Sequence, residues 1–262
     1  AVGMHALGSN TTASDNTAVG RSALANNTTA TNNTAVGRSA LALNTTGAGN
    51  VAIGAEALDS NTTGGYSVAI GNRALQANTN IGGNVAIGAD AMYTNTVGDK
   101  CVAVGSDSLK LNTTAVHCTA IGYGALTANT TGGNNTAVGK GALDANTTAT
   151  NNTAMGVDAL GANTTGADNT AMGRNALDAN TTGLNNTALG EGSLTANTTA
   201  SHQTVIGKGA GQTITTGAEN VLVGHEAGRD GNFSASTMIG RRAGAVTSGI
   251  NNTFLGHESE RL

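Results

Sequence analysis

Hydrophobic and polar positions follow one strict internal repeat along this chain. The phrase Asn-Val-Ala-Ile-Gly at residues 50–54 returns, with small changes, from one end of the chain to the other. Its closing glycines stand 17 residues apart thirteen times in succession and 16 residues apart in the last two repeats. A short fixed period is typical of stacked coils that contact only their neighbours. The pattern therefore predicts an all-β parallel solenoid of about sixteen coils.

Positions within a coil are numbered here from the closing glycine, which is position 0. The residue at −1 is always aliphatic or Met, and the residue at −3 is always Thr or Val. Side chains two residues apart lie on the same face of a strand, so these positions predict a short strand with an apolar face. We expect the −1 column to be buried inside the coil.

Position −2, on the opposite face of that strand, holds Ala in twelve consecutive coils and is never polar. Strands that are buried on both faces belong to sheets covered on both sides. The return segment of the coil covers one side, so we expect a second subunit to cover the alanine face. On this argument Ala120→Glu or Ala137→Glu would block assembly of an oligomer.

Two further columns follow the glycine. Position +4 is Leu in eleven coils and Met92 in one, which predicts a second strand or extended segment. Asn at +7, followed by Thr, predicts a corner that tolerates a left-handed turn and stacks its amides in a hydrogen-bonded ladder. Glycine often ends this run, as at Gly47 and Gly64, which favours a tight turn.

The last coils exchange volume between two columns. Large residues replace Ala at −2, while Gly replaces Leu at +4. If both columns fill one interior compartment, close packing requires that volume added in one column is removed from the other. We therefore divide the chain into regular coils at residues 1–200 and variant coils of the same solenoid at 201–262. The exchanged positions are Val205, Leu222, Met238 and Phe254 at −2, and Gly211, Gly228, Gly244 and Glu260 at +4.

The amino-acid composition disfavours an ordinary globular protein, a nucleic-acid-binding protein and a membrane-spanning helix. Aromatic residues are 2% and charged residues 11% of the chain, too little bulk for an ordinary globular core. The net charge of −4 provides no basic track for nucleic acid. No apolar run approaches the ~20 residues of a membrane helix, and we expect any export signal or anchor to lie outside this segment. Because the chain begins in the middle of the phrase, at Ala1, we expect it to be a piece of a longer protein.

Two motifs carry a family resemblance. Asn-Val-Ala-Ile-Gly-x-x-Ala, at 50–57 and 84–91, resembles the head repeat of trimeric autotransporter adhesins. Asn-Thr-Ala-Val-Gly-x-x-Ala-Leu-x-x-Asn-Thr-Thr, at 135–148, is similar to repeats of phage tail-fibre-like proteins. The resemblance covers essentially the whole chain and implies a left-handed β-roll assembled as a homotrimer and displayed outside a cell or on a virion. The coil is longer than the coil of adhesin heads, so the ligands of those adhesins are not expected for this chain.

Candidate chemistry is sparse. Residues 207–211, Gly-Lys-Gly-Ala-Gly, only partly match a phosphate-binding loop, because their glycines include position 0 of the repeat. The five histidines never cluster with Cys or carboxylates at metal-binding spacing, and no calcium-binding glycine-aspartate repeat is present. We therefore expect no catalytic residue, metal or cofactor, and the chain is interpreted as non-enzymatic.

Cys101 and Cys118 share one register on adjacent coils, which allows either a disulfide or two stacked thiols. Ten of the twelve Asn-Thr corners also match the N-glycosylation tripeptide, although the corner alone explains the motif. Repeated Thr is found in ice-binding solenoids too. However, the paired corner threonines, such as Thr45 and Thr46, point to opposite faces and give no flat Thr surface, which disfavours that function.

The sequence thus indicates an extracellular fibre module, the shaft or head of a homotrimeric adhesive fibre that attaches to a host-cell receptor, glycan or surface. The alternatives are the receptor-binding tail fibre of a phage or phage-like particle and a purely structural extracellular filament. Neither nucleic acid nor direct membrane insertion is expected. The sequence names no receptor and no binding residue.

Charged side chains at +2 test the register. They read Glu56, Arg73, Asp90 in one place and Glu226, Arg242, Glu258 in another, alternating in sign. Neighbours about 4.8 Å apart form exposed ion-pair ladders worth roughly 0.2–1 kcal/mol per link. We expect each arginine to lie between its two acids.

The coil count also predicts a length. Sixteen coils at about 4.8 Å each give a rod of roughly 75 Å. Small-angle X-ray scattering should therefore return the pair-distance distribution of an elongated particle. A compact, near-spherical profile would contradict the solenoid.

Overall fold

The computed structural model describes residues 1–246 and 248–259. This part of the chain contains no helix and forms a parallel β-solenoid of about 14 turns, which confirms the all-β parallel solenoid, while the exact coil count and the trimer stay predictions. Within it, therefore, no helix is long and apolar enough to cross a membrane. Glu260, one of the exchanged positions, lies outside the described residues. Contacts divide the chain into two units, residues 1–134 and 135–262.

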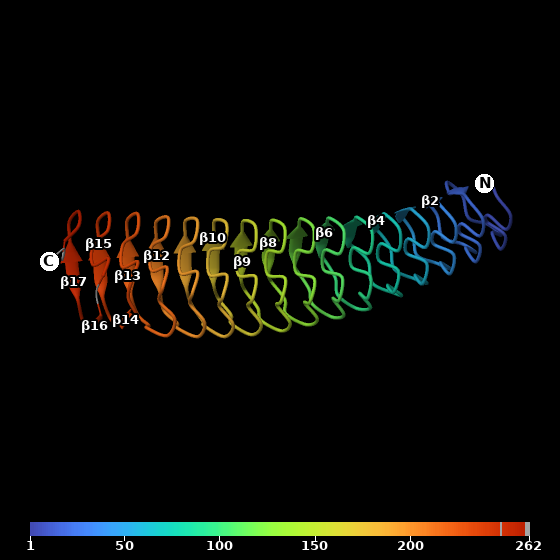
Figure 1. The fold of residues 1–262 in the computed structure, drawn as a ribbon. Coiled ribbons are helices and arrows are strands. Elements are labelled where there is room, and N and C mark those ends of the chain that lie inside the picture. The colour runs from blue at the N-terminus through green and yellow to red at the C-terminus, as the bar shows by residue number, and fades with distance from the viewer. Residues whose placement is uncertain (247, 260–262) are drawn as a thin grey trace. The chain divides into compact units, whose positions relative to one another are not determined.

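In each unit, every three-residue strand pairs in parallel with the strand one coil further on, as Ala18 pairs with Ala35 and Leu222 with Met238 (Figure 1). This register confirms the 17-residue period and its change to 16. The first unit holds β1 (Thr17–Val19), β2 (Thr34–Val36), β3 (Val51–Ile53), β4 (Val68–Ile70), β5 (Val85–Ile87), β6 (Val102–Val104) and β7 (Thr119–Ile121). The second holds β8 (Thr136–Val138), β9 (Thr153–Met155), β10 (Thr170–Met172), β11 (Thr187–Leu189), β12 (Thr204–Ile206), β13 (Val221–Val223), β15 (Thr237–Ile239) and β17 (Thr253–Leu255), with the short pair β14 (Phe233–Ser234) and β16 (Gly249–Ile250).

The strand faces are the reverse of the expectation. Ala52 is fully buried in its own coil, whereas Ile53 next to it is 39% exposed. The physical reason is the narrow interior, in which the small alanine leaves room for the buried leucine of the return segment. The alanine face therefore needs no second subunit. Ala120, likewise fully buried, faces the interior, so Ala120→Glu would disturb folding of the coil rather than assembly.

The shared interior confirms the exchange of volume in the last coils. A methyl group built on Gly211 would lie 3.0 Å from Leu222 Cδ1, and one on Gly244 would lie 2.9 Å from Phe254 Cδ2. Positions −2 and +4 therefore face each other across one compartment. The larger side chains at −2 occupy the space that Leu fills at +4 in earlier coils.

The return segment is a run of turns and not the expected second strand. Leu58 and Leu75 at +4 are fully buried but have left-handed φ angles of 50° and 52°. This conformation costs an L-residue about 1–2 kcal/mol, and burial of the leucine side chain returns about 1.5–3 kcal/mol. The Leu58 amide also donates to the Ala74 carbonyl at 3.0 Å. Packing thus holds a backbone conformation that leucine alone disfavours.

The corner asparagines form the expected ladder. Asn61 Nδ2 donates to Asn44 Oδ1 at 2.8 Å and to the Gly64 carbonyl at 2.9 Å, while Asn78 Nδ2 donates to Asn61 Oδ1 at 3.0 Å. These side chains are fully buried. The left-handed corner residue, however, stands at −5, as at Tyr66 with φ 59°, and not at the ladder asparagine.

A second ladder, which the sequence analysis missed, stands at −4. The Asn50 amide donates to Asn33 Oδ1 at 2.9 Å, and Asn50 Nδ2 donates to the Gly64 carbonyl at 2.8 Å. The column is buried, and Ser67 continues it in the next coil. The recurring Asn four residues before each glycine was the signal available in the sequence.

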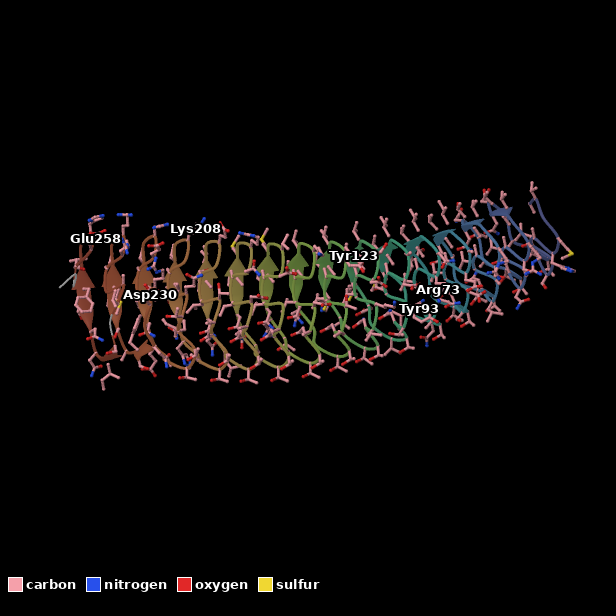
Figure 2. All side chains as sticks on the ribbon, in the orientation of Figure 1. Arg73, Tyr93, Tyr123, Lys208, Asp230 and Glu258 are labelled. Carbon is pink, nitrogen blue, oxygen red and sulfur yellow. The ribbon has the colours of Figure 1, made fainter. Side chains whose placement is uncertain are left out.

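The charged side chains at +2 confirm that successive coils are in register, although one arginine has a different ion-pair partner from the one expected. Arg242 lies between its two acids, with Nε 3.3 Å from Glu226 Oε2 and Nη1 3.5 Å from Glu258 Oε1, as expected. Arg73 pairs with Asp90, Nη2 to Oδ2 at 2.7 Å, and its guanidinium lies 5.1 Å from the centre of the Tyr93 ring (Figure 2).

The expected ion pair between Arg73 and Glu56 was wrong. Glu56 instead accepts from Arg38 Nη2 at 2.6 Å and from Gln76 Nε2 at 3.0 Å. The backbone still places Arg73 one coil above Glu56, because the Arg73 amide donates to the Ala55 carbonyl at 2.9 Å. The coil register therefore holds, and only the choice of partner differs.

Asn61→Ala should loosen the solenoid around its coil. It removes Asn61 Oδ1, one of the two acceptors of the buried Asn78 amide, and one of the two donors to the Gly64 carbonyl, which keeps Asn50 Nδ2, at a cost of about 1–3 kcal/mol. Hydrogen exchange of the backbone amides in the coils on either side should accelerate accordingly. Thr63→Ala, at the exposed corner, is the matched control and should change exchange little. Equal effects of the two variants would refute a stabilising role for the ladder.

Candidate functional site

The outward face of the strands is an uncharged apolar surface in both units. Alternation along each strand directs positions −3 and −1 away from the interior, and neither column contains a charged residue. Several −1 side chains are well exposed, for example 37% at Ile87 and 40% at Ile121 in the first unit, and 40% at Met155 and 38% at Met172 in the second, while others such as Val104 are half-buried. This surface, positions −3 and −1 of the strands, is called the strand face below.

The threonines of the strand face differ from those of the corner. At the corner, Thr45 Oγ1 donates to the Thr62 carbonyl at 3.0 Å, so its hydroxyl helps to join two coils. In the described part of the chain, the hydroxyls of Thr153 and Thr170 at −3 make no hydrogen bond. The strand face therefore presents hydroxyl and methyl groups to whatever lies against it.

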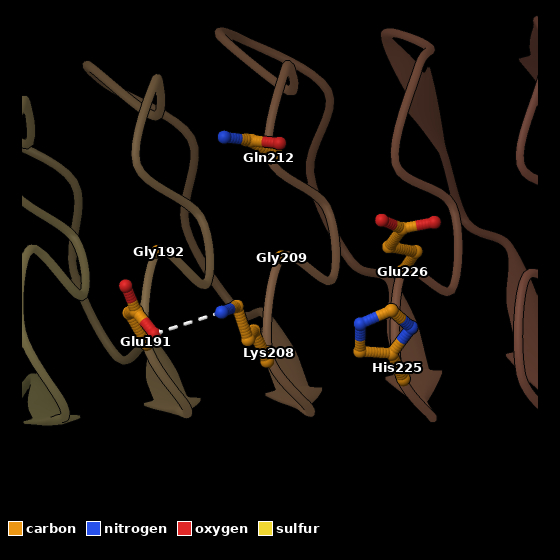
Figure 3. Close-up of a pocket in the computed structure, with 7 residues that line it drawn as sticks. All are labelled: Glu191, Gly192, Lys208, Gly209, Gln212, His225 and Glu226. Atoms are coloured by element: carbon orange, nitrogen blue, oxygen red, sulfur yellow. Dashed lines mark ion pairs between the residues drawn. The ribbon is translucent and has the colours of Figure 1, made fainter.

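A second feature is a shallow hollow of about 140 Å³ in the second unit (Figure 3). It opens where position +2 is glycine in two consecutive coils, Gly192 and Gly209, both with left-handed φ angles. The coils on either side carry Asn175 and Glu226 at this position. The hollow is lined by Glu191, Gly192, Lys208, Gly209, Gln212, His225 and Glu226.

Ion pairs fix the charged groups of the hollow. Lys208 Nζ lies 3.0 Å from Glu191 Oε2, and Glu191 also accepts from Arg174. These two cations lower the pKa of the Glu191 carboxyl, with the Arg174 hydrogen bond as the larger cause. Glu226 Oε2 lies 3.0 Å from Arg229 Nη1 and 3.3 Å from Arg242 Nε. Both carboxylates therefore already have cationic partners.

The glycine-rich run at 207–211 borders the hollow without forming a phosphate-binding loop. The amides of Gly207, Gly209 and Gly211 donate to the carbonyls of Leu189, Glu191 and Ala227 at 2.7–2.9 Å. Amides that bond neighbouring coils are not available to cradle a phosphate. The glycines serve the fold, in agreement with the repeat-based interpretation.

The histidines lie apart from one another. Arg241 stands between His225 and His257 in the coil stack, and its Nη1 is 2.9 Å from His257 Nε2. Among the described residues, no group of three or more His, Cys, Asp or Glu side chains is arranged to hold a metal ion.

Cys101 and Cys118 replace asparagine in the second ladder as buried thiols, which answers the question that the sequence left open. The Cys118 amide donates to Cys101 Sγ at 3.4 Å, and Cys101 Sγ donates to the Ala115 carbonyl at 3.4 Å. The hydrogen bond with the Cys118 side chain, followed by burial, raises the pKa of the Cys101 thiol.

The corner tripeptides are unsuited to glycosylation in the folded chain. From Asn27 to Asn197, the corner side chains are fully buried, and the ladder uses their amides, as at Asn163. Asn10, in the first coil, is exposed. The turn motif therefore accounts for the repeated tripeptide.

Comparison with family models, with curated proteins and with solved structures finds no match to this chain. The strand face and the hollow are therefore the features of this chain from which a function can be inferred.

The buried thiols should react slowly in the folded chain. At pH 8, a raised pKa and burial keep Cys101 protonated, so a colorimetric thiol reagent should react at least about 100-fold more slowly than with the chain unfolded in guanidinium. The unfolded chain should then titrate two thiols without a reductant. Fewer than two thiols in the unfolded chain would reveal a disulfide instead.

Proposed function

We propose that this chain is a non-enzymatic, extracellular module of a homotrimeric fibre, serving as the shaft or head that attaches the fibre to a host cell or surface. The observation that carries the proposal is the strand face. Its −1 column is about 40% exposed at Ile53, Ile87 and Ile121 in the first unit and at Met155, Met172, Ile206 and Ile239 in the second, and it is half-buried at the coils between them. A long apolar stripe of this kind on a secreted protein marks an interaction surface.

Energetics favour a second and third copy of the same chain as the partner. Burying the exposed part of one −1 side chain contributes about 1 kcal/mol, so several coils together supply enough apolar area for a stable interface. Identical chains in register place the same columns against each other at every coil, which a closed symmetric assembly requires. Three copies around one axis bury all three strand faces and leave the turns and corners in solvent.

The remaining surfaces suit display rather than catalysis. Asparagine ladders and ion pairs join the coils of each unit, as Arg242 joins three coils. Repetition of one coil produces a stiff spacer, which suits both an adhesin and the receptor-binding tail fibre of a phage-like particle. A purely structural filament uses the same stiffness but requires joining of the fibre ends.

Sedimentation velocity tests the assembly. The chain should sediment as a trimer at micromolar concentration, and the double variant Ile53→Lys, Ile87→Lys should dissociate it, because two charges would be buried in each strand face. Val97→Lys, at an exposed corner position that is 47% exposed, is the matched control and should remain trimeric. A folded monomer of the unmodified chain would count against the proposal.

The strand face also favours a second candidate function, ice binding. The corner threonines disfavour this function, because they point to opposite faces. The threonines at −3 are different: Thr153 and Thr170 pair in register and point outward beside an aliphatic column, so they form an array with one threonine per coil. An ice-binding chain uses this face as a monomer, whereas a trimer buries it. Thermal hysteresis by the unmodified monomer supports the second function, and its absence in a trimer supports the first.

A further inference from the structure

Position +1 of the last coils carries a nitrogen base in four consecutive repeats. The column consists of Lys208, His225, Arg241 and His257 and is called the basic column here. The coils are in register, because the residue after each base donates its amide to the carbonyl of the base one coil earlier. Glu226, Arg242 and Glu258 do so to Lys208, His225 and Arg241, each at 2.9 Å. The bases therefore repeat about every 4.8 Å along one edge of the second unit.

The two strongest cations of this column reach into solvent. The Lys208 side chain is 64% exposed and that of Arg241 is 52% exposed. Figure 3 shows Lys208 and His225 side by side on neighbouring coils at the mouth of the hollow. A row of exposed cations with one spacing suits a ligand whose negative charges also repeat.

Neighbouring carboxylates form ion pairs with the cations of these coils. Glu191 and Glu226 each contact two cations, Asp230 pairs with Arg229, and Glu258 lies 3.6 Å from Arg241. Residues 174–259 contain five arginines and lysines, Arg174, Lys208, Arg229, Arg241 and Arg242, and six carboxylates, because Asp178 and Glu219 join the four above. The positive charge that is most open to solvent along the basic column therefore lies on Lys208 and Arg241.

The hollow beside the basic column provides room for an uncharged part of such a ligand. No atom lies within 3.6 Å of a methyl group built on Gly209, and the exposed Gln212 amide adds a donor and an acceptor at the rim. Carboxylate, ammonium, imidazole and amide groups together suit hydroxyl groups, which donate and accept hydrogen bonds. The lining contains no Phe, Tyr or Trp, and the His225 imidazole is its single aromatic ring, so the hollow lacks the row of aromatic rings on which successive nucleic-acid bases stack.

We infer that the basic column and the hollow bind an acidic polysaccharide, with sulfate or carboxylate groups on Lys208 and Arg241 and a sugar ring over Gly209. The inference rests on the proposed function, because it names the class of surface molecule to which the fibre attaches. Each anion would contact one or two coils, so binding strengthens with the number of repeats that the polymer spans.

Binding to heparin tests the inference, with uncharged dextran and a single-stranded oligothymidine as comparison ligands. At low salt the chain should bind heparin and not dextran, and Lys208→Gln with Arg241→Gln should weaken heparin binding about tenfold. Lys140→Gln is the matched control. Lys140 is also an exposed cation at +1, but the next coil carries the uncharged Val157 at that position, so Lys140 belongs to no row of bases. This variant should change heparin affinity less than about twofold.

A second variant tests the hollow without a change of charge. Gly209→Ser restores a side chain of the kind that Ser22 and Ser39 supply at +2, both with φ near that of Gly209, so the coil should fold. It should weaken heparin binding while leaving the retention of inorganic sulfate unchanged. Unchanged heparin affinity would remove the hollow from the site.

Three outcomes overturn the inference: no heparin binding, equal loss in the Lys140 variant, or equal affinity for oligothymidine, which would indicate general polyanion binding. Sedimentation of the same samples separates this result from the proposed function. A trimer that does not bind heparin refutes the polysaccharide alone, whereas heparin binding by a monomer refutes the trimeric fibre.

Discussion

Hydrogen bonding between successive coils is the interaction on which the rest of this structure depends. A coil of 17 residues has an interior too narrow for a large apolar core, and its corners bury backbone carbonyls that must find donors. Two asparagine ladders supply them: Asn61 caps the Gly64 carbonyl from within its own coil, and Asn50 reaches the same carbonyl from the coil before. Each ladder amide also contacts the next coil, so neither coil is complete alone.

The closing glycine meets a related constraint. Gly54 has a φ angle of 134°, and a methyl group there would overlap the Gly71 carbonyl of the next coil. Close stacking of the coils therefore requires glycine at position 0, while the left-handed leucine at +4 is held by burial. The glycine at position 0 and the left-handed leucine at +4 together turn the chain after each strand without a helix. They also leave the aliphatic −1 column on the outside of the coil.

The two surfaces on which the proposed functions rest are consequences of this stacking. Because alanine and leucine fill the interior, the strand face is left apolar and uncovered, and the proposed trimer buries it. Each column repeats once per coil, so a change of residue type within a column changes the surface at that coil alone. Glycine at 192 and 209 opens the hollow, and bases from 208 onward make the basic column beside it.

The sequence by itself determined the period, the strand positions, the corner ladder and the exchange of volume in the last coils, because each depends on residue type at a fixed register. Only the tertiary structure decided which face of the strand lies inside. Both faces are apolar, so alternation cannot separate them, and the choice follows from fitting Ala52 opposite a buried leucine. The conformation of Leu58 and the pairing of Glu56 with Arg38 were likewise hidden, since packing overrides local preference and several cations were within reach. The hollow needed the structure for the same reason: Gly192 and Gly209 are 17 residues apart in sequence, and only stacking makes them neighbours.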